Sequence, residues 1–201
     1  MPLAYWSFEQ IGDGPVVYWW GTDDAAGIDY QRGFLHRYLS ADARPSDVFE
    51  CTEQPWGSYD PQGAAQAPTS TYGYNGYYLS PAQTPGWAFS VGNRPWLDIG
   101  KVRDAAQVFA FADAAIDLGG ERPRNTALLD PPMLYQSAGV WSTNDYPTTA
   151  FRHDRRTQAA HVDGHVAPYA LQPEAITSPR FYIGAVGRGN GPHYVPDWRE
   201  W

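Results

Sequence analysis

Apolar residues along this chain occur in short runs separated by glycine, proline and polar residues. Residues 108–113 are apolar on both faces until the final aspartate, which predicts a central strand of a sheet. Residues 15–20 and 48–51 predict two further short strands. In residues 29–39 the apolar side chains share one helical face and Asp29 is a suitable N-cap, so this segment is the best helix candidate.

Two β-hairpins are predicted from dipeptides that favour tight turns. Residues 70–80 contain an Asn-Gly pair, which supplies the two positive φ angles of a type I′ turn. Residues 157–169 turn in the same way at Asp163 and Gly164. Most of residues 114–150 are expected to be loop, because strand and helix patterns are weak there.

Composition narrows the fold class. The chain has 201 residues, of which 43% are hydrophobic and 18% charged, so it has enough apolar surface to fold. The 20 glycines and 18 prolines favour short strands and turns over a helical bundle. We therefore expect one α+β domain over residues 1–201, mainly antiparallel β-sheet with hairpins and long loops and one short helix.

Charge and cysteine content exclude several classes of function. The net charge is −8, and Lys101 is the one lysine, so the chain lacks the basic surface that nucleic acid or anionic lipid requires. The single cysteine, Cys51, excludes an intrachain disulfide and a Cys-rich zinc site, and it is interpreted as a small apolar core residue. No stretch approaches the length of a transmembrane helix, and the first residues lack the pattern of a signal peptide.

The pattern His161-x-Asp163-x-His165 resembles a set of metal ligands. An Asp-Gly turn at its centre predicts instead that His161 pairs with Val166, which places the two histidines on opposite faces. A metal-dependent hydrolase is accordingly the second alternative function. A structural Ca²⁺ that uses Asp163, Asp113 or loop carbonyls is also considered, although no EF-hand loop is present. No Gly-x-Ser-x-Gly motif marks a nucleophile, and no set of residues in the sequence identifies a reaction.

Aromatic side chains suggest another alternative. In the predicted hairpin Tyr72, Tyr74 and Tyr77 share one face, which is interpreted first as a sheet face in or beside the core. The competing interpretation is a platform for stacking sugars, with Tyr78 and Trp56 as further exposed contacts. This would make the chain a secreted carbohydrate- or solute-binding module.

A longer motif is more specific. His153 is followed by nine residues and then by Asp163-Gly164, and this segment resembles the prepilin-type processing-associated H-X9-DG domain family of bacterial pilin-like proteins. Further segments are similar to that family in the same order: 18–21, 48–51, 72–78, 108–113 and 129–132. The resemblance covers about residues 15–170 and leaves residues 171–201 as a glycine-rich C-terminal extension, expected to pack on the motif-bearing region.

The resemblance implies a pilin or pseudopilin, whose leader is cut by a prepilin peptidase and whose hydrophobic N-terminal helix assembles a membrane-anchored filament. It implies an extracytoplasmic, non-catalytic head without a cofactor. The implied partners are other pilin-like subunits or components of a type II secretion-like machinery. Because the hydrophobic helix is missing here, we expect a truncated chain. We hypothesise that His153 hydrogen-bonds Asp163 or nearby backbone and locks the hairpin.

Overall fold

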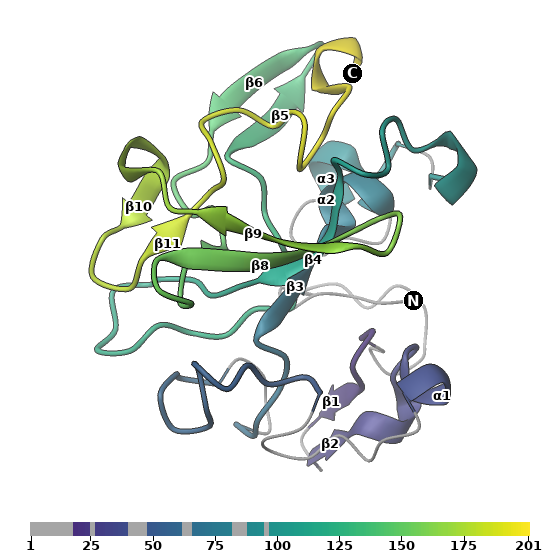
Figure 1. The fold of residues 1–201 in the computed structure, drawn as a ribbon. Coiled ribbons are helices and arrows are strands. Elements are labelled where there is room, and N and C mark those ends of the chain that lie inside the picture. Colours follow the sequence, from purple (N-terminus) through teal and green to yellow (C-terminus); the bar gives the residue numbers. More distant parts are fainter. Residues whose placement is uncertain (1–17, 25–26, 40–47, 62–65, 82–87, 95–96) are drawn as a thin grey trace.

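The largest sheet has four antiparallel strands in the order β3-β4-β8-β9 (Figure 1). They are β3 (Tyr72–Tyr74), β4 (Phe109–Asp113), β8 (Arg156–His161) and β9 (Val166–Ala170). The computed structural model describes residues 18–24, 27–39, 48–61, 66–81, 88–94 and 97–201. As predicted, β4 is a central strand with a neighbour on each side, which explains why it is apolar on both faces.

The predicted hairpin at residues 157–169 is confirmed, but its turn is one residue longer than expected. Ala160 pairs with Val166, and the His161 N–H donates to the carbonyl of His165 at 2.8 Å. Gly164 has φ of 96°, which is typical of the left-handed residue that ends a three-residue hairpin loop. The prediction that His161 and His165 lie on opposite faces is therefore wrong, because their rings stack with centroids 4.0 Å apart.

The predicted hairpin at residues 70–80 does not form. After β3 the chain enters a short helix, α2 (Gly76–Leu79), while β3 itself pairs with β4. Asn75 is fully buried and donates from Nδ2 to the carbonyls of Phe109 at 3.0 Å and Tyr194 at 2.9 Å. These hydrogen bonds connect Asn75 to two distant segments of the chain, so the residue does not form a local turn.

The helix candidate at residues 29–39 is divided into a 3-10 helix, η1 (Tyr30–Arg32), and an α-helical turn, α1 (His36–Leu39). Asp29 caps η1 as predicted, because its side chain accepts from the N–H of Gln31 at 3.0 Å. Gly33 interrupts the helix with an extended backbone. A Cβ on Gly33 would lie 2.5 Å from the carbonyl carbon of Trp20, so the chain passes too close for a larger residue.

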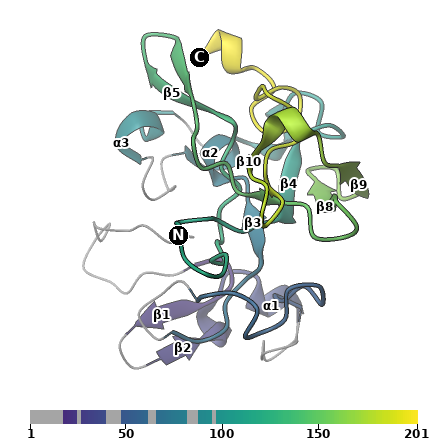
Figure 2. The same cartoon turned by 90° about the vertical axis from the view of Figure 1, so that its left-hand side faces the viewer.

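Smaller sheets flank the central one. The pairs are β1 (Thr22–Asp24) with β2 (Gly27–Asp29) and β5 (Met133–Ser137) with β6 (Val140–Thr143), and both are antiparallel. The figures place the β1–β2 pair with α1 at one end of the molecule and the β5–β6 hairpin with the C-terminus at the other (Figures 1 and 2). Residues 114–150 are mostly loop, as expected, and the β5–β6 hairpin is a strand pair within them that was not predicted.

A three-stranded antiparallel sheet has the order β10-β11-β7. The remaining elements are short: β7 (Thr149–Ala150), β10 (Ile176–Ser178), β11 (Ile183–Gly184), α3 (Ala88–Val91), η3 (Ile99–Lys101), η4 (Pro173–Ala175) and η5 (Trp198–Glu200). The strands predicted at residues 15–20 and 48–51 are wrong where they can be compared: residues 18–20 and 48–51 form bends and turns. Residues 15–17 lie outside the described residues.

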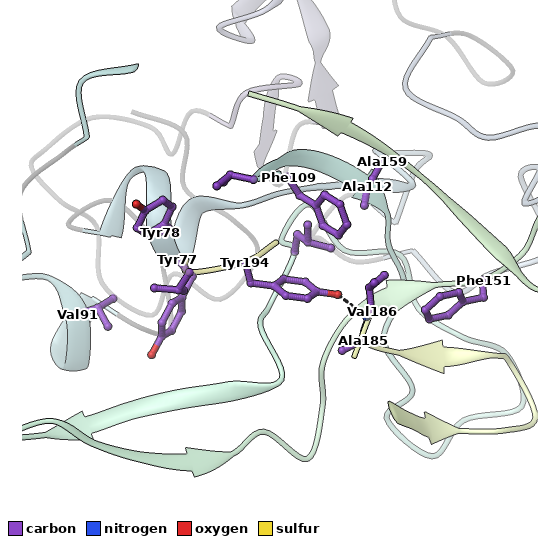
Figure 3. Packing of buried hydrophobic residues seen from close by; sticks show 13 residues of the cluster. Tyr77, Tyr78, Val91, Phe109, Ala112, Phe151, Ala159, Ala185, Val186 and Tyr194 are labelled. Carbon is purple, nitrogen blue, oxygen red and sulfur yellow. Dashed lines mark hydrogen bonds between the residues drawn. The ribbon is translucent and has the colours of Figure 1, made fainter. Parts of the chain in front are cut away.

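The main hydrophobic core joins the central sheet to the C-terminal segment (Figure 3). Phe109, Phe151, Val186 and Tyr194 are all buried in it. The hydroxyl of Tyr194 accepts from the N–H of Val186 at 2.8 Å and lies 2.7 Å from Oγ1 of Thr149. The glycine-rich C-terminal residues thus supply core side chains.

A second cluster packs Trp19, Trp20, Phe49 and Ala127 beside the sheet. Together these observations establish a fold of mainly antiparallel sheets with few and short helices. Within the part of the chain that the structure describes, every helix falls short of the length and apolarity needed to span a bilayer.

Candidate functional site: a Cys-Asp-His centre

Three side chains that are far apart in the sequence meet at one end of β4. Nε2 of His153 lies 3.2 Å from Sγ of Cys51 and 3.2 Å from Oδ2 of Asp113. The three ligand atoms all lie within 4.8 Å of one another. We refer to Cys51, Asp113 and His153 as the Cys-Asp-His centre.

Asp113 is placed by its position as the last residue of β4. Its carboxylate is fully buried, and Oδ2 accepts the backbone N–H of Gln158 in β8 at 2.7 Å. Cys51 is also buried, and its N–H donates to Oγ1 of Thr71 at 2.7 Å. Thr71 directly precedes β3, so the central sheet holds both residues.

His153 is presented by a tight turn that leads into β8. The backbones of His153 and Arg156 exchange two hydrogen bonds, of 3.0 and 3.1 Å. Between them Asp154 and Arg155 have φ angles of 52° and 58°, the left-handed region that residues with a Cβ rarely adopt. Such backbone strain is retained where the surrounding structure requires one particular geometry, and this turn directs His153 toward Asp113.

Arg152 neutralises the other side of Asp113. Its Nη1 lies 3.9 Å from Oδ1, and only 9% of the Arg152 side chain is exposed. Its Nη2 donates to the carbonyls of Ala114 at 2.8 Å and Thr71 at 3.3 Å, which fixes the guanidinium in place. The carboxylate of Asp113 therefore has a cation beside one oxygen and the imidazole of His153 beside the other.

Tyr72 adjoins the centre from the neighbouring strand. It pairs directly with Asp113 across β3 and β4. Burial, followed by the proximity of Cys51 and Asp113, raises the pKa of Tyr72 to about 12. The phenol consequently stays neutral beside the centre.

The geometry does not fit a nucleophilic relay. In such a relay the base contacts the nucleophile through one ring nitrogen and its orienting carboxylate through the other. Here Cys51 and Asp113 both contact Nε2 of His153, and the thiol is 2% exposed. The arrangement can cross-link three segments through hydrogen bonds or through a shared ion.

The motif residues His153 and Asp163 do not contact each other. Asp163 forms a pair with the ring of His165 at 2.7 Å, and both side chains are substantially exposed. Its pKa is lowered by the backbone N–H and the ring of His165. The hypothesis that His153 hydrogen-bonds Asp163 is wrong, because His153 points to Asp113 and Cys51 instead.

The pattern of possible metal ligands at His161, Asp163 and His165 adopts a different arrangement from the one expected. His161 is buried, and its Nε2 lies 3.0 Å from the hydroxyl of Tyr169, whereas Asp163 is engaged by His165. Burial, and then His165 and His193, lowers the pKa of His161. Among the residues described, the Cys-Asp-His centre is the set of three such side chains whose ligand atoms converge.

The predicted sugar platform is not present as a surface. Tyr77 and Tyr78 are buried to 0% and 2% exposure, because α2 turns them into the main core. Tyr72 and Tyr74 are half-buried against the second cluster. Trp56 is 43% exposed and packs edge-on against Tyr59, apart from the other four.

Sequence reasoning missed Cys51 as part of a site and treated it as a core residue. The available signal was Asp113, a carboxylate that ends an otherwise apolar strand, for which a polar anchoring role can be read from sequence.

A scan against protein-family models, a search of curated proteins and a search of solved structures each found no match.

Proposed function

We propose that this chain is the extracytoplasmic head of a pilin-like protein, a structural subunit of a bacterial surface or secretion filament that assembles with related subunits and catalyses no reaction. The observation that carries the proposal is the Cys-Asp-His centre. Cys51, Asp113 and His153 come from three segments that resemble the H-X9-DG family, and these segments meet at one place.

The pairing of the strands supports the same proposal. Residues 72–78 also carry the resemblance, and β3 within them pairs with β4, which ends at Asp113. The segments that carry the resemblance are thus in contact with one another in the fold, and this supports the proposal.

The chemistry of the centre supports a structural role. Cys51 and Asp113 are buried, and His153 has a side-chain exposure of 26%. A buried thiol without a relay geometry suits a fixed cross-link between segments better than attack on a substrate.

The proposal is tested by locating the full-length protein in the bacterium that carries the gene. Antibodies against this chain are used on sheared surface material, membranes and cytosol, in the wild type and in a strain without prepilin peptidase. We expect the signal in the membrane and sheared fractions, and we expect it to leave the sheared fraction when the peptidase is absent. A signal confined to the cytosol, or a sheared-fraction signal independent of the peptidase, would overturn the proposal.

A further inference from the structure

We propose that Cys51, Asp113 and His153 bind one Zn²⁺ ion, which cross-links the three segments of the head. Thiolate, imidazole and carboxylate are the three side-chain ligand types that Zn²⁺ uses in proteins. This inference goes beyond the proposed function and does not depend on it.

Two of the three distances between the ligand atoms are close to those of a tetrahedral site. With Zn–S of about 2.3 Å and Zn–N and Zn–O of about 2.0–2.1 Å, tetrahedral angles place sulfur about 3.5 Å from nitrogen and nitrogen about 3.3 Å from oxygen. The corresponding distances here are 3.2 Å from Sγ of Cys51 to Nε2 of His153 and 3.2 Å from Nε2 to Oδ2 of Asp113. Two of the three separations therefore lie within a few tenths of an ångström of the tetrahedral values, and the third, between the sulfur of Cys51 and the carboxylate of Asp113, is within 4.8 Å.

Hydrogen bonding alone explains the centre less well. Nε2 of His153 offers one hydrogen-bonding position, either an N–H or a lone pair, and it faces both the sulfur of Cys51 and the carboxylate of Asp113. A cation held by the lone pair of Nε2 gives all three ligands one common partner, which a single proton cannot do.

The ligand set also selects the ion. Ca²⁺ and Mg²⁺ take oxygen ligands, so the thiol and imidazole argue against the structural Ca²⁺ considered at Asp113 from the sequence. One thiolate and one carboxylate balance the charge of Zn²⁺, and binding releases the proton of the Cys51 thiol to solvent. Arg152 stays on the Oδ1 side of Asp113, opposite the proposed ion.

Surrounding groups hold the ligands in position. The N–H of Gln158 orients Oδ2 of Asp113, and Thr71 fixes the backbone of Cys51. Such supporting hydrogen bonds are typical of metal centres. Because the His153 side chain is 26% exposed, a water molecule from solvent can serve as the fourth ligand.

The test is titration of the reduced, chelator-treated 201-residue chain with Co²⁺, followed by competition with Zn²⁺. Co²⁺ replaces Zn²⁺ in tetrahedral sites and reports thiolate ligation through a charge-transfer band. We expect one equivalent of Co²⁺ with this band and its displacement by Zn²⁺. We also expect saturating Zn²⁺, at about 100 times Kd, to raise Tm by about 5–10 °C.

Three variants test which side chains bind the ion. Cys51→Ser should abolish the charge-transfer band, and His153→Ala should weaken Co²⁺ binding at least about 100-fold. His165→Ala is the matched control, since it removes a histidine from an exposed Asp-His pair, and it should bind as the wild type does. Absence of the band in the folded wild-type chain, or equal weakening by His165→Ala and His153→Ala, would overturn the proposal.

Discussion

Replacing Asp113 with alanine tests how much the Cys-Asp-His centre contributes to the fold. The carboxylate of Asp113 is fully buried and lies beside the buried guanidinium of Arg152. Asp113→Ala leaves that cation without its counter-charge, and it also removes the acceptor of the Gln158 N–H. Removing one partner of a buried ion pair costs about 3–5 kcal/mol, because the other charge stays buried and unpaired.

The assay is urea unfolding in the presence of a chelator, so that no bound ion contributes. With an m-value of roughly 2–3 kcal/mol/M, the expected loss lowers the urea midpoint by about 1–2 M. Asp163→Ala is the matched control, because that aspartate lies in an exposed turn, and its midpoint should stay at the wild-type value.

A second variant separates lost charge pairing from lost packing. Asp113→Ala combined with Arg152→Met removes both charges, and we expect it to recover part of the loss, since apolar replacements of buried pairs are well tolerated. A loss below about 1 kcal/mol for Asp113→Ala, or an equal loss for Asp163→Ala, would refute the reasoning.

Three further predictions concern the core and the histidines. Tyr194→Phe should cost about 1–3 kcal/mol in urea unfolding, because the buried N–H of Val186 loses its acceptor. Gly73→Ala should cost about 1–3 kcal/mol or prevent folding, because its Cβ would lie 2.6 Å from the carbonyl of Leu128. Burial is the main cause that lowers the pKa of His161 and of His193, so the unfolded chain binds protons more readily, and stability should fall as the pH is lowered through about 6.5.

The two core predictions have controls of the same residue type. Tyr182→Phe alters an exposed tyrosine, and Gly189→Ala adds a Cβ in open space, so both should unfold as the wild type does. For the pH dependence, His161→Gln should lessen the decline in stability below pH of about 6.5. A Tyr194→Phe variant as stable as Tyr182→Phe, a fully stable Gly73→Ala variant, or the same decline in His161→Gln would contradict the corresponding argument.

Local sequence patterns predicted the elements in which neighbouring residues determine the outcome. The apolar run ending at Asp113 correctly predicted that β4 is a central strand, and the Asp163-Gly164 pair correctly predicted the turn between β8 and β9. Asp29 was correctly predicted as a cap, since a capping side chain needs only the next two residues. The turn was nevertheless one residue longer than predicted, and that difference moved His165 to the same face as His161.

Predictions failed where distant contacts outweigh local preference. The Asn-Gly pair favours a tight turn, but the amide of Asn75 makes two hydrogen bonds to backbone carbonyls far away in the chain. Gly33 ends the helix candidate because the chain passes against Trp20 there, a contact that no local pattern reveals.

The Cys-Asp-His centre lay beyond sequence reasoning for the same reason. Cys51 and His153 are 102 positions apart, so no spacing connects them. The motif that contains His153 directed attention to Asp163, its neighbour in the pattern, whereas the fold pairs it with Asp113. The one sign of this partner in the sequence was Asp113, an aspartate at the end of an apolar strand.

Immunogold electron microscopy of the bacterium that carries the gene tests the proposed function most directly. Antibodies raised against this chain are applied to whole cells and to thin sections, with a gene-deletion strain as the control. The account predicts gold particles at the cell envelope and along surface filaments, and none on the deletion strain. Gold distributed through the cytoplasm, with the envelope and filaments unlabelled, would contradict it.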